Sequence, residues 1–453
     1  MKGNSQAWLA PTARSRTGRL DPAWLITLFA IAIAITPEFE FLGIPKIRLT
    51  DLLLPVILVV NIGALRNQPA RTKKASISLI LIIATGLIMQ NLAALLAFGG
   101  AGLFPGLYYL GKRVALFLIL YLGYTAVNDV QSWNRVVRAL VFTTPLLNLS
   151  VIWELSTKIA QGGVHATGEG MRASGIIANQ QTSTGLFIVI LFCLAIGMWG
   201  AYLDPAWRFG VLIAFSSGCL ALLATGSRGP MASAVLAIVL LAAMNPRRGL
   251  GLAIFLGSIG AISWVVTPDA LRDRLGGIVP ETRATLAGLA DPELMPEWGG
   301  SSIADRAITA HQALVYYIPK AGLMGLGAGY RPLGAWDNFW LTECVYHGKV
   351  GLLVFLTLFL AALGLLIREI RAARDPAEKG AAQGVTAALL VMAASGIHAD
   401  SFYLIRPMEA LMLLLGLVAA RSRIRQSSGE FAVSGPHSAS SRSGRGNEAR
   451  RWS

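Results

Sequence analysis

Charged residues are scarce in this sequence of 453 residues. Asp, Glu, Lys and Arg make up only 14% of it, whereas soluble proteins carry about a quarter. Hydrophobic residues make up 54%, and the mean hydropathy is +0.58. About twelve membrane helices of roughly 20 residues each would use residues in that proportion. The composition therefore predicts a protein that crosses a membrane many times, and it excludes soluble, fibrous and disordered classes.

Cysteine is also rare, and acidic residues are outnumbered. The three cysteines, Cys193, Cys219 and Cys344, have no spacing typical of a disulfide framework or a zinc site. The net charge of +15 would by itself suggest nucleic-acid binding. In a membrane protein, however, an excess of Lys and Arg more often marks the cytoplasmic loops.

The apolar runs predict an all-α membrane protein with about twelve transmembrane helices. None of the runs has the alternation of a barrel strand. The first run follows a long basic segment and lacks a good cleavage site, so we expect it to be a span and not a signal peptide. The predicted spans lie near residues 22–37, 50–65, 75–98, 105–125, 134–155, 183–200, 206–225, 229–244, 248–267, 347–367, 383–399 and 404–420.

Lys and Arg predict the orientation of these spans. They cluster before span one, between spans two and three, between eight and nine, between ten and eleven, and after span twelve. With both termini in the cytoplasm, every cluster falls on the cytoplasmic side, as the positive-inside rule requires. The one long loop then lies outside, and it holds nine acids against six bases. Membrane orientation thus accounts for the basic excess, and we expect no nucleic-acid partner.

This topology divides the chain into five parts. We expect a basic cytoplasmic N-terminus at 1–21, nine spans within 22–267, a large periplasmic loop at 268–346, three spans within 347–420 and a cytoplasmic tail at 421–453. The loop is expected to be partly helical around Ile303–Ile318. Residues 370–380 are expected to form a solvated connection, and the Ser/Gly/Arg-rich tail from about 426 to be disordered.

Ionisable groups within or beside membrane spans are costly and usually mark a pathway or a site. Outward-facing arginines run against the positive-inside rule, and their planar guanidinium groups suit phosphate or carboxylate. They therefore favour an anionic partner, although helix capping or contact with lipid headgroups would explain any one of them. The ionisable residues expected on the outer side are Arg172, Arg228, Arg306, Asp337, Glu343, His347 and Arg406.

Three local patterns accompany these residues. Ala224–Pro230 is a tight break between two apolar runs, with Arg228 as its one long side chain; an ordinary hairpin is the alternative. Arg172–Asn179 leads into the sixth span. Gly325–Tyr330 lacks the Gly-Lys-Ser/Thr of a Walker A loop and the context of a dinucleotide fingerprint. We expect it to form a flexible or tightly turned end of the loop.

Asp337-Asn338 follows the glycines. Nine residues then separate Asn338 from Gly348, and Gly351 comes three residues later; these glycines would let the tenth span pack closely. In this order, the patterns over about 170–365 resemble the O-antigen ligase and polymerase superfamily of bacterial membrane proteins. That family acts on undecaprenyl-pyrophosphate-linked sugars. Where its ligases have His-Asn, this sequence has Asp337-Asn338, which favours a polymerase of exopolysaccharide or O-antigen repeats over a ligase.

The resemblance implies a glycosyltransferase at the outer face of the bacterial inner membrane. Its donor and partner would be an undecaprenyl-pyrophosphate-linked oligosaccharide in membrane lipid, with a flippase and a chain-length regulator as further candidate partners. Arg228 and Arg306 would stabilise the departing pyrophosphate. Asp337 would be the base that accepts the proton of the attacking hydroxyl, with His347 as the alternative.

Four further residues are expected to bind pyrophosphate or glycan, namely Arg172, Asn179, Asn338 and Arg406. The external acids have no compact metal-ligand spacing, so we expect a metal-independent reaction without a cofactor. Two alternatives remain: an O-antigen ligase that transfers glycan to lipid A-core, and a polysaccharide or lipid-sugar transporter. A transporter of two six-span halves often has a long link between them, whereas residues 201–205 form a short one.

The topology predicts which engineered cysteines a membrane-impermeant thiol reagent reaches in intact cells. A cysteine near Ala290 should be labelled, whereas one near Arg71 or at Ser440 should be labelled only after the cells are opened. The unsubstituted chain is the control for its three native cysteines. Labelling at Ser440 in intact cells would contradict the orientation.

Overall fold

The structure of the protein is a computed structural model, which describes residues 21–37, 39–41, 44–66, 78–98, 103–160, 173–175, 181–199, 204–246, 308–327 and 338–433. These residues form helices joined by turns, with one pair of short antiparallel strands. The elements are α1 (Pro22–Ile35), β1 (Phe39–Phe41), β2 (Ile44–Ile47), α2 (Leu49–Arg66), α3 (Ser78–Phe98), α4 (Leu103–Ala126), α5 (Val130–Ala160), α6 (Gln181–Met198), α7 (Pro205–Thr225), α8 (Arg228–Met244), η6 (Ala313–Tyr317), α13 (Ile318–Ala321), α14 (Phe339–Ala372), α15 (Pro376–Ser395), η7 (Ser401–Tyr403) and α16 (Ile405–Val433).

The helical membrane architecture predicted from the apolar runs is confirmed. Eleven of the twelve predicted runs coincide with helices, and the run at 248–267 lies outside the described residues. Among the described residues, six helices are long and apolar enough to cross a membrane: α3, α4, α5, α6, α7 and α14. Helices α1 and α8 and the first part of α2 are apolar but shorter. The count of twelve spans therefore stays a prediction.

Three helices begin with the same pair of residues, an aspartate followed by a proline. The aspartates Asp21, Asp204 and Asp375 accept a hydrogen bond from the backbone N–H two residues later, at 3.0–3.1 Å. An aspartate there satisfies a free N–H of the first turn, and proline loses nothing at a position where its N–H would have no helical partner. These pairs start α1, α7 and α15, and each aspartate also lies within 4 Å of an arginine: Arg135, Arg138 and Arg421 respectively.

Glycines let several helices approach one another closely. A side chain at Gly197 of α6 would collide with the backbone of Gly380 on α15, and one at Gly416 of α16 would collide with Leu120 on α4. Helices in membranes pack by such close contact, because lipid tails supply no hydrophobic force between them. Helix α6 is the central one, and every residue from Ser183 to Met198 is buried.

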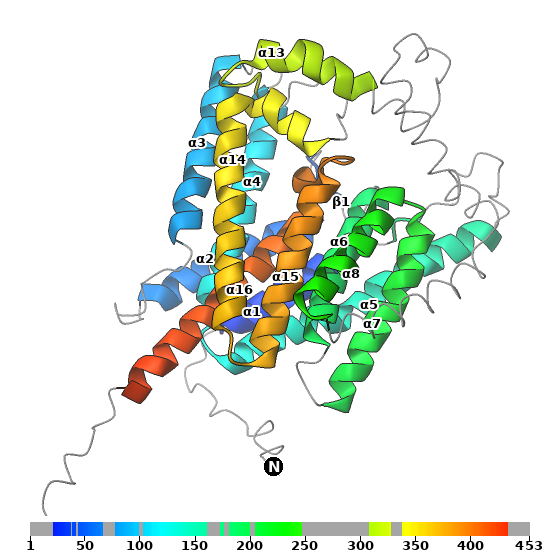
Figure 1. Ribbon diagram of the computed structural model, residues 1–453, viewed down its shortest axis with the longest axis vertical. Coiled ribbons are helices and arrows are strands. Elements are labelled where there is room, and N and C mark those ends of the chain that lie inside the picture. Colours follow the sequence, from blue (N-terminus) through cyan, green and yellow to red (C-terminus); the bar gives the residue numbers. More distant parts are fainter. Residues whose placement is uncertain are drawn as a thin grey trace, which may run out of the picture.

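The bundle has two ends that differ in composition. Helices α14 and α15 run side by side in Figure 1, and their short connection lies at its lower end. We call this the basic end, because Arg368, Arg371, Arg374, Arg421, Arg423 and Arg425 lie on or beside it. The connection from α15 through η7 to α16 lies at the opposite end, which we call the turn end.

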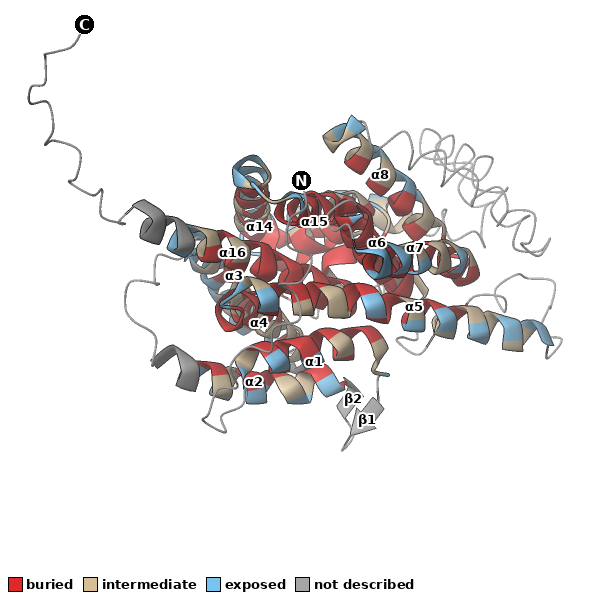
Figure 2. Ribbon diagram, turned by 90° about the horizontal axis from the view of Figure 1, so that it is seen from below, coloured by how far each residue is buried: buried red, intermediate tan, exposed pale blue. Residues whose placement is uncertain are grey.

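The outer faces of the helices carry large apolar side chains. Figure 2 shows the buried residues facing the interior and the exposed ones along the outside of helices such as α5. Trp153 is 77% exposed, Val59 70% and Ile82 69%. A soluble monomer rarely exposes such a broad apolar surface. Lipid is the environment that fits it.

The described parts of the predicted loop are helical. Residues 308–321 form one helical stretch that includes η6 and α13, which confirms the helix expected around Ile303–Ile318 over its described part. Two other expectations need correction. Glu378, in the connection expected to be solvated, is buried, because α15 already begins at Pro376. The tail expected to be disordered from 426 continues as helix to Val433.

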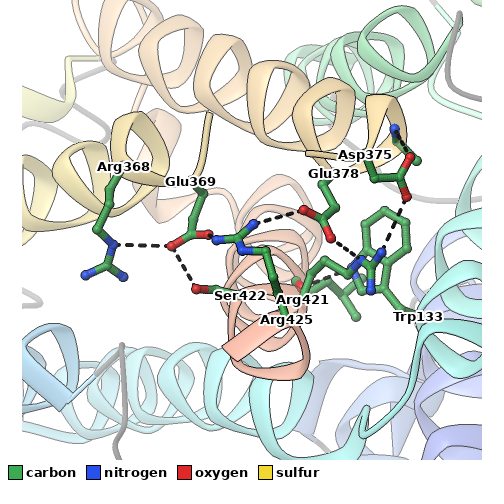
Figure 3. A network of polar contacts seen from close by, with 10 residues as sticks. Trp133, Arg368, Glu369, Asp375, Glu378, Arg421, Ser422 and Arg425 are labelled. Atoms are coloured by element: carbon green, nitrogen blue, oxygen red, sulfur yellow. Dashed lines mark hydrogen bonds and ion pairs between the residues drawn. The ribbon is translucent and has the colours of Figure 1, made fainter. Parts of the chain in front are cut away.

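An ion-pair network ties α16 to α14 and α15 at the basic end, as Figure 3 shows. Arg425 donates to Glu369 at 2.7 Å and to Glu378 at 2.9 Å. Arg421 lies 2.9 Å from Glu378, and the Ser422 hydroxyl donates to Glu369 at 2.9 Å. Both glutamates are about 95% buried. Their burial makes each depend on the basic side chains, since an unpaired buried carboxylate is costly.

Glu378→Gln should therefore destabilise the protein more than a change at an exposed partner of the same network. We expect a loss of about 2 kcal/mol, because Arg421 and Arg425 lose a charged acceptor. Arg368→Gln is the matched control: Arg368 pairs with Glu369 at 3.2 Å but is 55% exposed, so its loss should cost little. Thermal unfolding of the detergent-solubilised variants measures both. Equal shifts in Tm would contradict a role for burial.

Candidate functional site

The connection Ser395–Asp400 gathers the first residues of two helices at the turn end. Asn338 caps α14: its side chain accepts the N–H of Leu341 at 3.1 Å and donates to the Ile397 carbonyl at 2.9 Å. The Phe339 N–H donates to the Gly396 carbonyl at 2.8 Å. The start of α14 is therefore fixed on this connection by both side chain and backbone.

Helix α8 meets the same connection from another direction. The hydroxyls of Ser233 and Ser395 lie 2.7 Å apart, and the imidazole of His398 packs against the backbone of Gly229. A side chain at position 229 would collide with that imidazole. Gly229 directly follows Arg228, so His398 lies beside the arginine that the sequence singled out.

The break before α8 is the tight turn that the sequence predicted. Gly226 has the left-handed backbone angles φ 57° and ψ 17°, which a glycine adopts without strain. Ser227 is extended, and Arg228, half-buried, is the first residue of α8. The guanidinium group thus starts from the end of α8 where the helix dipole is positive.

The segment Ala173–Gly175 packs against this break. The Ala173 N–H donates to the Ala224 carbonyl at 3.1 Å, and the Ser174 carbonyl accepts the hydroxyl of Thr184 at 2.9 Å. The Arg172–Asn179 pattern therefore joins the Ala224–Pro230 pattern over its described part. Asn338, from the pattern that follows the glycines, reaches the same place through the Ser395–Asp400 connection.

The predicted site residues fall into three groups. Arg228 and Asn338 both lie at the Ser395–Asp400 connection. His347 and Arg406 lie elsewhere. Arg172, Asn179, Arg306 and Asp337 lie outside the described residues.

His347 is enclosed between α14, α3 and η7. It follows Asn338 by nine residues of helix, which corresponds to about 13 Å at 1.5 Å per residue. Its side chain is fully buried, its Nε2 atom lies 3.2 Å from the Tyr403 hydroxyl, and its carbonyl accepts the Gln90 amide at 2.6 Å. His347 is therefore part of a buried network and does not share the connection with Arg228.

Arg406 is bound to the end of α1. Its guanidinium is buried and donates to the carbonyls of Ile33, at 3.3 Å, and Thr36. Carbonyls at a helix end have no helical donor, and arginine can supply one. The sequence predicted the depth of this residue but not its neighbour.

The buried network around His347 contains an ion pair that the sequence reading missed. Arg113 donates to Glu343 at 2.8 Å and to the Asn91 side chain at 3.0 Å. Tyr403 also donates to Glu343, at 3.0 Å, and its ring lies under the Arg113 guanidinium at 4.7 Å. Arg113 and its neighbour Lys112 are two charged residues inside the apolar run predicted at 105–125, which is the signal for such a pair.

Tyr403 stays protonated in this network. Burial, followed by the nearby Glu343 carboxylate, raises the pKa of Tyr403 well above its usual value, although Arg113 acts in the opposite direction. The hydroxyl therefore remains a donor to Glu343 and holds η7 against α14.

The described part of the glycine-rich segment, up to Gly327, is tightly turned and completes a break in α14. At Gly348 the helix has φ 66° and ψ −170°, so carbonyls near it lose their helical donors. The N–H groups of Leu326 and Gly327 donate to Val345 and Tyr346, at 2.8 and 3.0 Å. Gly325 and Gly327 have φ values of 85° and 89°, which glycine tolerates.

Close packing at the start of the tenth predicted span is also present. A side chain at Gly351 would contact Gln90 of α3, and one at Gly348 would collide with the backbone of Leu323. Across the part of the chain that the structure describes, no three His, Cys, Asp or Glu side chains gather as a metal site requires.

The glycine-rich segment offers a comparison between two positions with the same backbone preference. Gly325→Ala should destabilise the protein on the order of 3 kcal/mol, because the positive φ is strained for alanine and the new Cβ would meet Tyr346 and His347. Gly322→Ala, at φ 58° with open space around it, should cost only about 1 kcal/mol. Tm values of the purified variants test the difference. Equal losses would show that the contact with α14 contributes nothing.

No protein-family model matches this chain, and no curated protein matches its sequence. The resemblance to the O-antigen ligase and polymerase superfamily therefore stays a prediction from its motifs. The chain is a helical membrane protein whose three sequence patterns meet at one end of the bundle.

Proposed function

We propose that this protein is a membrane glycosyltransferase that joins lipid-linked oligosaccharides. It transfers a glycan from an undecaprenyl-pyrophosphate donor to a sugar hydroxyl, at the outer face of the bacterial inner membrane. Extension of exopolysaccharide or O-antigen repeats is the favoured form of this reaction, and ligation to lipid A-core is the alternative.

One observation supports this proposal above the others: segments far apart in the sequence meet at the turn end. Ala173 pairs with Ala224 in the break before α8, and α8 and the start of α14 both contact the Ser395–Asp400 connection. None of the three patterns is specific alone. Their contact is what a single site made from all three requires.

The arrangement of charge supports an outward-facing site. The turn end lies opposite the basic end, and the positive-inside rule assigns the basic end to the cytoplasm. Arg228 then lies on the outer side, where a cation is less common. Lipid-linked repeats are polymerised on that side once they have crossed the membrane.

Arg228 suits the departing pyrophosphate for two reasons. Its guanidinium can make two parallel hydrogen bonds to phosphate oxygens, and it stands at the positive end of α8. Charge builds on the pyrophosphate as its bond to the sugar breaks, and a fixed cation stabilises that charge. Arg306 and Arg172 are proposed to assist.

The attacking hydroxyl also needs a base. The sequence nominates Asp337, which precedes Asn338, and leaves His347 as the alternative. His347 is buried and engaged with Tyr403, so its place in the structure favours Asp337 between these two. Asn338 is proposed to fix the backbone next to the acceptor sugar.

A transporter is the second candidate function, and the Arg113–Glu343–Tyr403–His347 network is the observation that favours it. Buried ionisable groups between membrane helices often mark a proton or ion path. Activity in detergent solution distinguishes the two functions. Glycan transfer can proceed there, whereas transport cannot, because it needs two compartments.

Replacing Arg228 tests the transferase directly. Arg228→Ala and Arg228→Lys should both lower the rate about a hundredfold, or roughly 3 kcal/mol, because lysine cannot reproduce the two-pronged contact. The assay is extension, in detergent, of undecaprenyl-pyrophosphate-linked repeats extracted from cells that lack this protein. Product length is read on a gel.

Arg368→Lys is the matched control, since Arg368 is an exposed arginine at the basic end, and its rate should equal that of the wild type. A chelator should leave the wild-type rate unchanged. Wild-type activity in Arg228→Ala would contradict the role of this residue, and loss of activity with chelator alone would assign the leaving group to a metal.

A further inference from the structure

His398 lies in the tightest part of the Ser395–Asp400 connection. Its backbone N–H and that of Ala399 both donate to the Ser395 carbonyl, at 3.1 and 3.0 Å. Ser395 is fully buried, and its hydroxyl contacts Ser233 of α8. The backbone that carries His398 is therefore anchored to α8.

The imidazole is placed by its contact with Gly229. A Cβ atom at position 229 would collide with the Nε2 and Cδ2 atoms of His398, so only glycine leaves room for the ring. The side chain is half-buried, and its Nε2 atom is enclosed against Gly229. The ring thus lies beside the residue that follows Arg228, and it is less enclosed than that of His347.

Asn338 approaches from the other side. Its amide donates to the carbonyl of Ile397, the residue before His398, and Ile397 itself is 67% exposed. His398 is therefore flanked by the two predicted site residues that the structure describes at this connection. No partner of His398 could be predicted from the sequence, because it lies 169 positions after Gly229.

The charged groups around this ring come from two elements. Arg228 is on α8, and Asp400 is on the connection itself, where it accepts the Thr342 hydroxyl of α14 at 2.6 Å. Glu343, also on α14, is turned to Arg113 and Tyr403. Asp337 precedes Asn338 in the chain and lies outside the described residues. Any change of rate with pH has to be apportioned among these groups.

We propose that His398 is the base of the transfer reaction, in place of Asp337. This inference rests on the proposed glycosyltransferase function. The oxygen of the acceptor hydroxyl forms a bond to the anomeric carbon of the donor sugar, and the bond from that carbon to the pyrophosphate breaks. The electron pair leaves with the pyrophosphate beside Arg228, and the hydroxyl proton passes to the imidazole and then to water.

Imidazole chemistry fits this role better than a carboxylate. Histidine side chains as a class change charge between about pH 5 and 8, whereas free aspartates do so near pH 4. A general base works best when it titrates close to the working pH. The two candidates therefore predict different acid limits for the reaction.

The test compares the pH dependence of repeat extension in three proteins, the wild type, His398→Gln and Asp337→Asn, with the extracted lipid-linked repeats described above. We expect the wild-type rate to decrease as the pH falls below about 6.5, a decrease that we call the acid limb. His398→Gln should be about a hundredfold slower and should lack the acid limb. Asp337→Asn should keep the limb. His311→Gln, which changes an exposed histidine outside the site, is the control and should match the wild type.

Two further variants separate chemistry from folding. His398→Ala should regain activity when free imidazole is added, and the gain should rise with pH as the added base loses its proton. Gly229→Ala, which keeps the histidine but displaces its ring, should be slow and should not respond to imidazole. A merely structural role for His398 predicts no rescue.

The outcomes distinguish the two proposals. A wild-type protein that extends no repeat at any pH, with bound lipid and fold intact, overturns the glycosyltransferase proposal itself. A wild type that extends repeats, together with a His398→Gln variant that keeps the wild-type pH profile, overturns only the role of His398. Loss of the acid limb in Asp337→Asn would return the base to Asp337.

Discussion

Every backbone N–H and C=O that lies away from water must find a partner within the protein, and this constraint determines where the helices of this bundle can stop. A continuous helix meets it without help. The breaks at Gly226 and Gly348 do not, and each is completed by a distant segment. Ala173 pairs with Ala224 beside the first break, and residues 322–327 pair with both sides of the second. Since both breaks lie at the turn end, the segments that complete them are brought there too.

The ionic contacts at both ends of the bundle are largely buried. At the basic end, Arg421 and Arg425, whose side chains are 12% and 22% exposed, hold the three last helices together. At the other end, Arg113 and Glu343 are enclosed, with side chains that are 13% and 0% exposed. Enclosed pairs add little net stability but fix geometry, because any displacement leaves a charge unpaired. The Tyr403 and Asp400 contacts with α14 extend this rigidity to the connection that carries His398.

The helices could be predicted from the sequence, because an apolar run of about 20 residues has one stable form in lipid. The break at Ala224–Pro230 could be predicted for a similar reason: only glycine there accepts the left-handed turn. The start of α14 at Phe339 was missed, since Thr342, Glu343 and His347 make that stretch too polar to suggest a buried helix. Their polarity is explained by partners on α3, α4 and η7.

The site residues were harder to predict than the helices. Hydropathy gives the depth of a residue in the membrane but not the neighbour it faces around the bundle. Arg228, His347 and Arg406 were all expected at the outer side, but the sequence did not reveal their neighbours. Arg228 precedes the glycine that meets His398, the His347 ring meets Tyr403, and Arg406 binds the end of α1. For the same reason, the contact of His398 with Gly229 could not be predicted: the two residues lie before and after the long predicted loop in the sequence.

The position of Arg228 carries a consequence for what the turn end binds. A cation at the first residue of a helix adds to the positive end of the helix dipole, an arrangement that by itself is unfavourable. Ser227, in the position before it, does not cap the first turn with its own hydroxyl. The local field therefore favours an anion above α8, where the guanidinium and the helix end act on it together. In the proposed reaction, that anion is the pyrophosphate of the donor.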